Sequence, residues 1–309
     1  MVDIDIILEK NEYAAGETAK GTLIISADKS FKVRGFKFSV SGEERIEINL
    51  DERYGFNPTA STTSTYKESN IFFSKDLSNF LKSIGTKVGD DNDNILEVPG
   101  GNWKVPFEFT IPLHALESYQ GEYAKIIYKI KATVNRAWRE DVDSNLSFTV
   151  FNQKRQYMNF ERSIREEIID KRDYEEINEK RDSHIRLELE GDDMNTFSPG
   201  ETIRGKITIE NSKVLNIRKI EVILGAIEFA QAKGKKKRTE IHPKYKEKIE
   251  WNEGSNNSGV IVVPFEIHIP KGIKRSYIGE YSEYYWLLEA KVDIPWSDDL
   301  YDRAIIQIT

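Results

Sequence analysis

The sequence predicts an all-β protein made of two β-sandwiches in tandem, and the prediction rests on two recurring blocks. A turn-and-strand signal stands at 15–18 as Ala-Gly-Glu-Thr and at 199–202 as Pro-Gly-Glu-Thr, at a shift of 184 positions (200 − 16). A proline-bounded block stands at 105–112 and at 263–270, at a shift of 158 positions (264 − 106). Both alternate apolar and polar residues, which is the period of a half-buried strand.

The order of the blocks is the same in both halves, and further matches follow them. Ser-Tyr-x-Gly-Glu-Tyr stands at 118–123 and at 276–281, and a tryptophan follows each, Trp138 and Trp296, all at the shift of 158. We interpret the chain as a tandem duplication whose first copy holds 26 additional residues (184 − 158) between its two blocks. We expect the two tryptophans to pack at strand ends, the alternative being an aromatic platform for a ligand.

Each half contains enough candidate strands for an immunoglobulin-type sandwich. In the first domain, residues 1–152, strands are predicted at 3–9, 18–28, 31–41, 43–50, 104–111, 123–135 and 144–151. Turn residues separate them, as in a two-sheet sandwich. Residues 184–309 repeat the pattern and are predicted to form the second sandwich.

The additional residues of the first copy lie within 51–103. A run rich in Ser and Thr at 57–65 predicts a mobile loop, and large apolar residues follow it. Positions shared by both copies are expected to build the sandwich, so the additional residues of the first copy are available for another role. We therefore predict that a protein partner binds here. The alternative is a segment that only covers the sandwich. The candidate contact residues are Phe72, Phe73, Leu77, Phe80 and Leu81.

Residues 153–183 interrupt the β pattern and predict a charged helical linker. Tyr157, Ile164 and Ile168 fall at helical spacing, and Glu-to-Lys or Glu-to-Arg pairs four residues apart accompany them. Two interpretations stay open. One is a helix that connects the sandwiches, and the other is a helix that binds a partner or mediates oligomers.

Composition narrows the class of protein. The net charge of −7 argues against general affinity for nucleic acid. The chain shows neither a signal peptide nor the run of about 20 apolar residues of a membrane span. With no cysteine in the chain, this indicates a cytoplasmic protein, free or peripheral to a membrane.

One segment, 233–248, is basic. Its core, Lys235, Lys236, Lys237 and Arg238, forms either a hydrated hairpin tip or a site for anionic lipid or phosphate.

The sequence offers no recognisable catalytic, metal or cofactor site. None of the four histidines pairs in sequence with a nucleophile or shows ligand spacing. The acidic turn at 89–94 lacks the spacing of an EF-hand loop. We predict a protein that is not an enzyme and needs no cofactor or metal.

The ordered set of motifs resembles the arrestin fold. It comprises the Gly-Glu corner, the basic-apolar strands at 32–38 and 217–222, the Pro-Phe-x-x-x-Ile-Pro block and Ser-Tyr-x-Gly-Glu-Tyr. Arrestins, alpha-arrestins, the arrestin-shaped retromer subunit and bacterial sporulation-control proteins share this shape. The resemblance implies an adaptor or scaffold that binds protein partners, such as cargo or membrane-protein tails, in trafficking or signalling. The alternatives are a carbohydrate-binding or hydrolytic β-sandwich and a structural protein that self-assembles.

Overall fold

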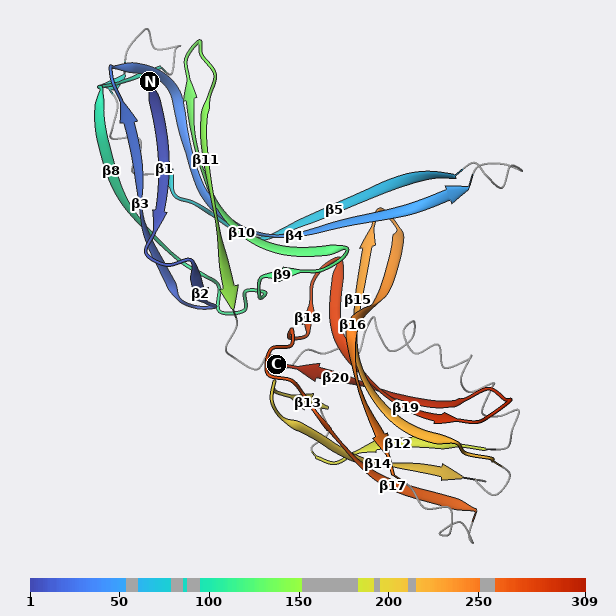
Figure 1. The fold of residues 1–309 in the computed structure, drawn as a ribbon. Helices are drawn as coiled ribbons and strands as arrows, with labels where there is room; N and C mark the ends of the chain where they lie inside the picture. The colour runs from blue at the N-terminus through green and yellow to red at the C-terminus, as the bar shows by residue number, and fades with distance from the viewer. Residues whose placement is uncertain are drawn as a thin grey trace. The chain divides into compact units, whose positions relative to one another are not determined.

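The computed structural model describes residues 1–53, 61–78, 86–87, 95–151, 183–191, 195–210, 215–250 and 259–309. The chain divides into two compact units, the first formed largely by Met1–Lys154 and the second largely by the residues that follow. Strands dominate both units (Figure 1). The described residues contain no helix that is long and apolar enough to cross a membrane.

The first unit contains a three-stranded and an eight-stranded sheet. The smaller sheet has the order β1 (Val2–Leu8), β3 (Thr18–Ala27), β8 (Gly101–Thr110). The larger has the order β2 (Glu12–Ala14), β11 (Val142–Phe151), β10 (Ala124–Arg136), β4 (Phe31–Arg53), β7 (Leu96–Val98), β6 (Thr86–Lys87). Beside this path, β5 (Ser61–Asp76) pairs with β4 and β9 (Tyr119–Gln120) pairs with β10.

Alternation along these strands places one face of each sheet in the core. In β10, for example, every second residue from Ala124 to Val134 is buried. Aromatic rings from both sheets meet there, with Phe38 against Phe107 at 5.0 Å and Phe109 against Phe148 at 5.8 Å between ring centroids. Such pairs add stability beyond the apolar area that they bury.

The second unit repeats this plan. Its three-stranded sheet has the order β12 (Ile185–Leu189), β14 (Thr202–Glu210), β17 (Val260–His268). Its six-stranded sheet has the order β13 (Thr196–Phe197), β20 (Leu300–Ile308), β19 (Ser282–Asp293), β15 (Lys219–Ala232), β16 (Lys235–Ile249), and β18 (Tyr277–Ile278) pairs with β19.

The motifs that recur in the sequence occupy matching positions in the two units. Pro106 pairs with Thr22 across β3 and β8, and Pro264 pairs with Lys206 across β14 and β17. The Ser118 N–H donates to the Val150 carbonyl at 2.8 Å. At the matching positions, the Ser276 N–H donates to the Ile308 carbonyl at 2.8 Å. The recurring residues therefore build the same sheet-closing contacts twice.

The predicted fold class is wrong in one part, the charged helical linker. The described residues form two sandwich-like units of strands and hold no α-helix, and residues 152–182 lie outside the described residues. The prediction rested mainly on charge pairs four residues apart. Each such pair stabilises a helix by only about 0.2–0.5 kcal/mol, and isolated helices are marginal without a packed apolar face.

Two local predictions in the first half are also corrected. The strands expected at 31–41 and 43–50 are one continuous strand, β4, of 23 residues. The loop expected at 57–65 is wrong for its second part, because Ser61–Asp76 forms β5. The Ser and Thr residues at 61–65 pair there with residues 49–53 of β4, and β-branched Thr is common in strands. Residues 54–60 lie outside the described residues.

Candidate functional site

The candidate binding surface lies on the β4–β5 ribbon of the first unit. β10 pairs with β4 only as far as Ile46, opposite Ala124. β5 continues to pair beyond that point, up to Arg53 opposite Ser61. The far part of the hairpin is therefore a two-stranded ribbon that leaves the sandwich, as Figure 1 shows. Within the described residues β5 pairs with β4 alone.

The five predicted contact residues fall in different environments. The Phe72 ring packs edge-on against the Tyr128 ring at 5.7 Å, and Leu77 is buried, 7% exposed. Phe73 is half-buried. Phe80 and Leu81 lie outside the described residues.

A β-bulge explains how neighbouring aromatic residues are accommodated. Gly42 pairs with Phe73 and Glu43 pairs with Ile71, so Phe72 has no partner of its own in the register. An extra residue of this kind bends a strand and breaks its strict alternation. Ile71 is left 61% exposed, although it is a large apolar side chain. The sequence pattern indicates the two phenylalanines and not Ile71, because alternation alone does not reveal a bulge.

A polar hollow lies on the same ribbon. It has a volume of about 620 Å³ and contains residues of β4, β5 and the turn before β10. Glu43 lies at one side, 8% exposed, with its carboxylate 2.7 Å from Arg45 Nη2 and 3.1 Å from Lys129 Nζ. The hydrogen bond from Arg45 lowers the pKa of Glu43, so the carboxylate is held ionised beside Arg45. The other charged lining residues are Glu47, Lys67, Glu68, Glu122 and Lys125.

The predicted basic residues follow the β15–β16 turn. Lys233 and Gly234 both have positive φ, 48° and 76°, which is the geometry of a tight hairpin turn. Lys235 and Lys236 are exposed and Lys237 is half-buried. The backbone of Arg238 belongs to β16, but its side chain lies outside the described part of the structure.

The two recurring tryptophans project into solvent, so the prediction that they pack at strand ends is wrong. Trp138 is 69% and Trp296 is 104% exposed. Both have left-handed backbones, with φ of 59° and 62°. Each turn is closed in the same way: the Arg136 N–H donates to Asp141 and the Ile294 N–H donates to Asp299, both at 3.1 Å. The sequence match identified a shared turn, and a shared turn requires no buried ring.

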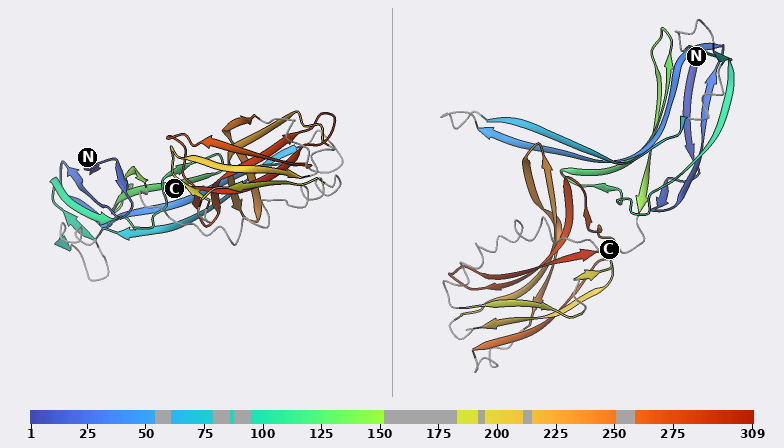
Figure 2. Two further views of the ribbon diagram at one scale, coloured as in Figure 1. Left: turned by 90° about the horizontal axis from the view of Figure 1, so that it is seen from below. Right: turned by 180° about the vertical axis from the view of Figure 1, so that it is seen from behind.

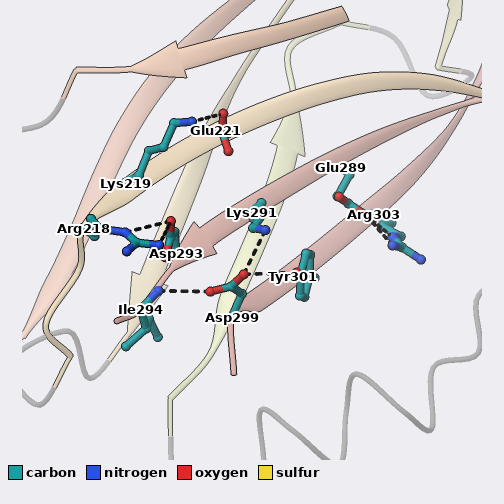
Figure 3. Close-up of polar contacts among 10 residues, drawn as sticks. All are labelled: Arg218, Lys219, Glu221, Glu289, Lys291, Asp293, Ile294, Asp299, Tyr301 and Arg303. Carbon is teal, nitrogen blue, oxygen red and sulfur yellow. Dashed lines mark hydrogen bonds and ion pairs between the residues drawn. The ribbon is translucent and has the colours of Figure 1, made fainter. Parts of the chain in front are cut away.

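Ion pairs surround the turn of the second unit (Figure 3). Arg218 makes a two-pronged contact with Asp293, at 2.7 and 2.8 Å from Nη2. Lys291 Nζ lies 2.8 Å from Asp299, which also accepts the Ile294 N–H and the Tyr301 hydroxyl. The hydrogen bond to Asp293 raises the pKa of Arg218, and the bond to Asp299 raises that of Lys291. These cations already have anionic partners. Two further pairs, Arg303 with Glu289 and Lys219 with Glu221, lie on the same strands.

Each unit is a two-sheet sandwich of the same construction, with an exposed tryptophan turn. The family model for the arrestin (or S-antigen) N-terminal domain matches residues 2–155 and again residues 185–308. The chain belongs to the arrestin family.

Curated relatives have the same family name. Arrestin domain-containing protein A of Dictyostelium discoideum is 27% identical over 308 residues, which cover 95% of this chain and 48% of that protein. Arrestin domain-containing protein 17 of Caenorhabditis elegans is 27% identical over 138 residues, 45% of this chain and 31% of that protein. The chain thus spans about half the length, or less, of these relatives.

One solved structure resembles this chain with lower sequence identity. Spo0M, the sporulation control protein from Bacillus subtilis, aligns with 86% of this chain and 90% of its own, at 13% identity and a TM-score of 0.34. The family assignment rests on the family model and not on this alignment.

Proposed function

We propose that this chain is a non-enzymatic adaptor that binds protein partners by adding a strand beside β5, which pairs with no strand but β4 among the described residues. The observation that carries the proposal is the β4–β5 ribbon, whose second strand pairs on one side only among the described residues. An open strand edge offers unpaired N–H and C=O groups to an extended peptide, and neighbouring hollows receive alternate side chains.

Exposed side chains along β5 would set the specificity of this contact. Ile71 supplies an apolar anchor, and the half-buried Phe73 lies two residues further along the strand. Lys67 lines the polar hollow beside Glu47, to which it forms an ion pair at 2.9 Å. An extended peptide with a basic or acidic residue near an apolar one fits this arrangement. Family membership implies partner binding in general, and a role in trafficking or signalling on the cytoplasmic side of membranes is part of the proposal.

A photo-crosslinking residue placed at position 71 of the full chain tests this proposal. The matched control carries the same residue at Val262, an exposed apolar position (55%) on β17 of the second unit. We expect a heterologous adduct at position 71 that is absent at 262. Equal labelling at both positions would contradict the proposal. Labelling at 71 of a second copy of this chain would favour self-assembly instead.

The basic hairpin supports a second candidate function, contact with an anionic membrane surface. The supporting observation is that Lys233, Lys235 and Lys236 are all exposed around one tight turn. Each basic residue near an acidic membrane contributes about 1 kcal/mol. Replacing Lys235, Lys236 and Lys237 by Ala should reduce co-sedimentation of the chain with acidic vesicles, and an unchanged pellet would refute this candidate.

We also infer that the chain arose by tandem duplication. Support comes from the two matches of one family model and from the paired hydrogen bonds of Ser118 and Ser276.

A further inference from the structure

A hollow of about 640 Å³ lies at the end of the first unit, where the β10–β11 turn meets the start of β1 and β4. The N-terminus and this turn lie at the same end of the unit in the views of Figures 1 and 2. The volume falls within the range of small-molecule sites in proteins. The lining residues are Met1, Val2, Asp28, Lys29, Ser30, Phe31, Lys32, Glu97, Arg136, Ala137, Trp138 and Arg139.

The lining of this hollow is positively charged, although the chain as a whole carries −7. Four basic side chains, Lys29, Lys32, Arg136 and Arg139, face two carboxylates, Asp28 and Glu97. Asp28 already binds the amine of Met1. None of the four basic side chains forms an ion pair with a carboxylate in the part of the chain that the structure describes.

One of these cations has a buried donor without an acceptor. The Nε of Arg136 is shielded from solvent and makes no hydrogen bond among the described residues. A buried polar group that lacks a partner destabilises the folded protein, and more so when it is charged, so native structures rarely keep one without a reason. A bound anion would satisfy this donor.

Trp138 forms the outer rim of the hollow. The Ala137 N–H donates to the Lys32 carbonyl at 2.9 Å and fixes the turn over the start of β4. Lys32 Nζ lies 6.0 Å from the centre of the Trp138 ring. The indole is 69% exposed in a left-handed conformation that bulky residues seldom adopt. The turn thus presents the indole to solvent beside the basic residues of the hollow.

We propose that this hollow binds the phosphate headgroup of an anionic phospholipid and docks the end of the first unit on a membrane surface. The basic residues and the Arg136 donor fit the phosphate oxygens, because charge-assisted hydrogen bonds to phosphate are strong. An indole beside them fits the boundary between headgroups and acyl chains, where tryptophan is enriched. A phosphate without a membrane would use the cations and leave the exposed indole without a role.

The second unit supplies the matched control. It presents Trp296 from the same kind of turn, but Arg218 and Lys291 are held by Asp293 and Asp299 (Figure 3). An exposed tryptophan alone should therefore give little membrane affinity. Affinity should depend on Trp138 together with the basic side chains that line the hollow.

Sedimentation of the full chain with vesicles tests the proposal. We expect binding to phosphatidylcholine mixed with phosphatidylserine and little to phosphatidylcholine alone. Replacing both Lys29 and Arg139 by Ala should lower the partition coefficient roughly 30-fold. Trp138→Ala should lower it several-fold and Trp296→Ala should leave it unchanged. All these side chains are exposed, so thermal melting should confirm that the variants fold.

Three outcomes would overturn the proposal. They are equal binding to neutral vesicles, loss of binding only in the variant with Lys235, Lys236 and Lys237 replaced, and a shift of the Trp138 indole resonance on adding inorganic phosphate without any vesicle binding. The second outcome would assign the membrane contact to the basic hairpin, and the third would assign the hollow to a soluble phosphate compound. None of them bears on the β5 edge, whose own test is crosslinking at position 71.

Discussion

At the scale of single residues, the left-handed backbone conformation of the two tryptophans destabilises the folded protein. A non-glycine residue at φ near 60° is strained, by about 1–2 kcal/mol. Trp138, with φ 59° and an exposed ring, loses little packing when the ring is removed. We expect Trp138→Gly to stabilise the protein by about 1 kcal/mol in urea unfolding, because glycine adopts this conformation without strain.

Trp138→Ala separates backbone strain from the effect of the ring. Alanine keeps the Cβ atom and thus most of the strain, so this variant should be no more stable than the wild type. If alanine and glycine stabilise equally, the ring and not the backbone is the source of the cost.

Glu43 gives the first unit a defined acid sensitivity. Its carboxylate binds Arg45 and Lys129, and the Arg45 contact lowers its pKa below the ordinary value of 4.5. A lowered folded-state pKa stabilises the protein above the unfolded pKa, and that contribution disappears as the pH falls through the folded value.

Glu43→Gln should therefore destabilise the protein at neutral pH, and the difference from the wild type should shrink below about pH 4.5. Urea unfolding at a series of pH values measures this difference. A stability gap that stays constant down to about pH 3 would show that Glu43 acts through packing rather than through its charge.

At the scale of elements, the β4–β5 pairing depends on one glycine. A Cβ atom on Gly42 would lie 2.7 Å from ring carbons of both Phe72 and Tyr128. These rings pack against each other, so neither has free space into which to move. We expect Gly42→Ala to destabilise the first unit by about 1–3 kcal/mol, the usual cost of overpacking.

Gly35 is the control in the same strand. Nothing lies within 4 Å of a Cβ atom built there, and its φ is not in the left-handed region. Gly35→Ala should be neutral or stabilise slightly, by about 0.5 kcal/mol. Equal destabilisation by both substitutions would mean that alanine disturbs β4 itself rather than the Phe72 contact.

The sequence predicts elements well where the pattern is local. Alternation and proline blocks place β1, β3, β8, β10 and β11 to within a few residues, because these strands bury one face. The sequence does not predict the β4–β5 ribbon as a single element. In the far part of the ribbon β4 and β5 pair only with each other, so that part needs no apolar alternation. The bulge at Phe72 and the basic hollow depend on residues brought together from distant positions, which no local pattern records.

At the scale of the whole molecule, the same turn occurs in two different electrostatic environments. Both units close their long hairpin with an aspartate on a backbone N–H and project a tryptophan from it. In the second unit the neighbouring cations are held in ion pairs, whereas those of the first line a hollow. The two units thus share the geometry of this turn, while the charges around it differ.

The repeat also predicts that matched substitutions act alike. The Ser118 hydroxyl oxygen accepts the Val150 N–H at 2.9 Å, and the Ser276 hydroxyl oxygen accepts the Ile308 N–H at 3.0 Å. Replacing either serine by Ala should leave one strand N–H without this acceptor and cost about 1–2 kcal/mol. The effect should be larger for Ser276→Ala, because Ser276 is only 3% exposed and water cannot replace the bond.

Hydrogen exchange reports each site separately, which matters because two units need not unfold together. The Val150 amide should lose protection in Ser118→Ala and the Ile308 amide in Ser276→Ala, each without an effect on the other. Ser74→Ala, at an exposed position of β5, is the control and should change neither amide. Faster exchange at both amides in a single variant would mean that the two sandwiches unfold as one cooperative body, which would contradict the independent closure of each sandwich by its own serine.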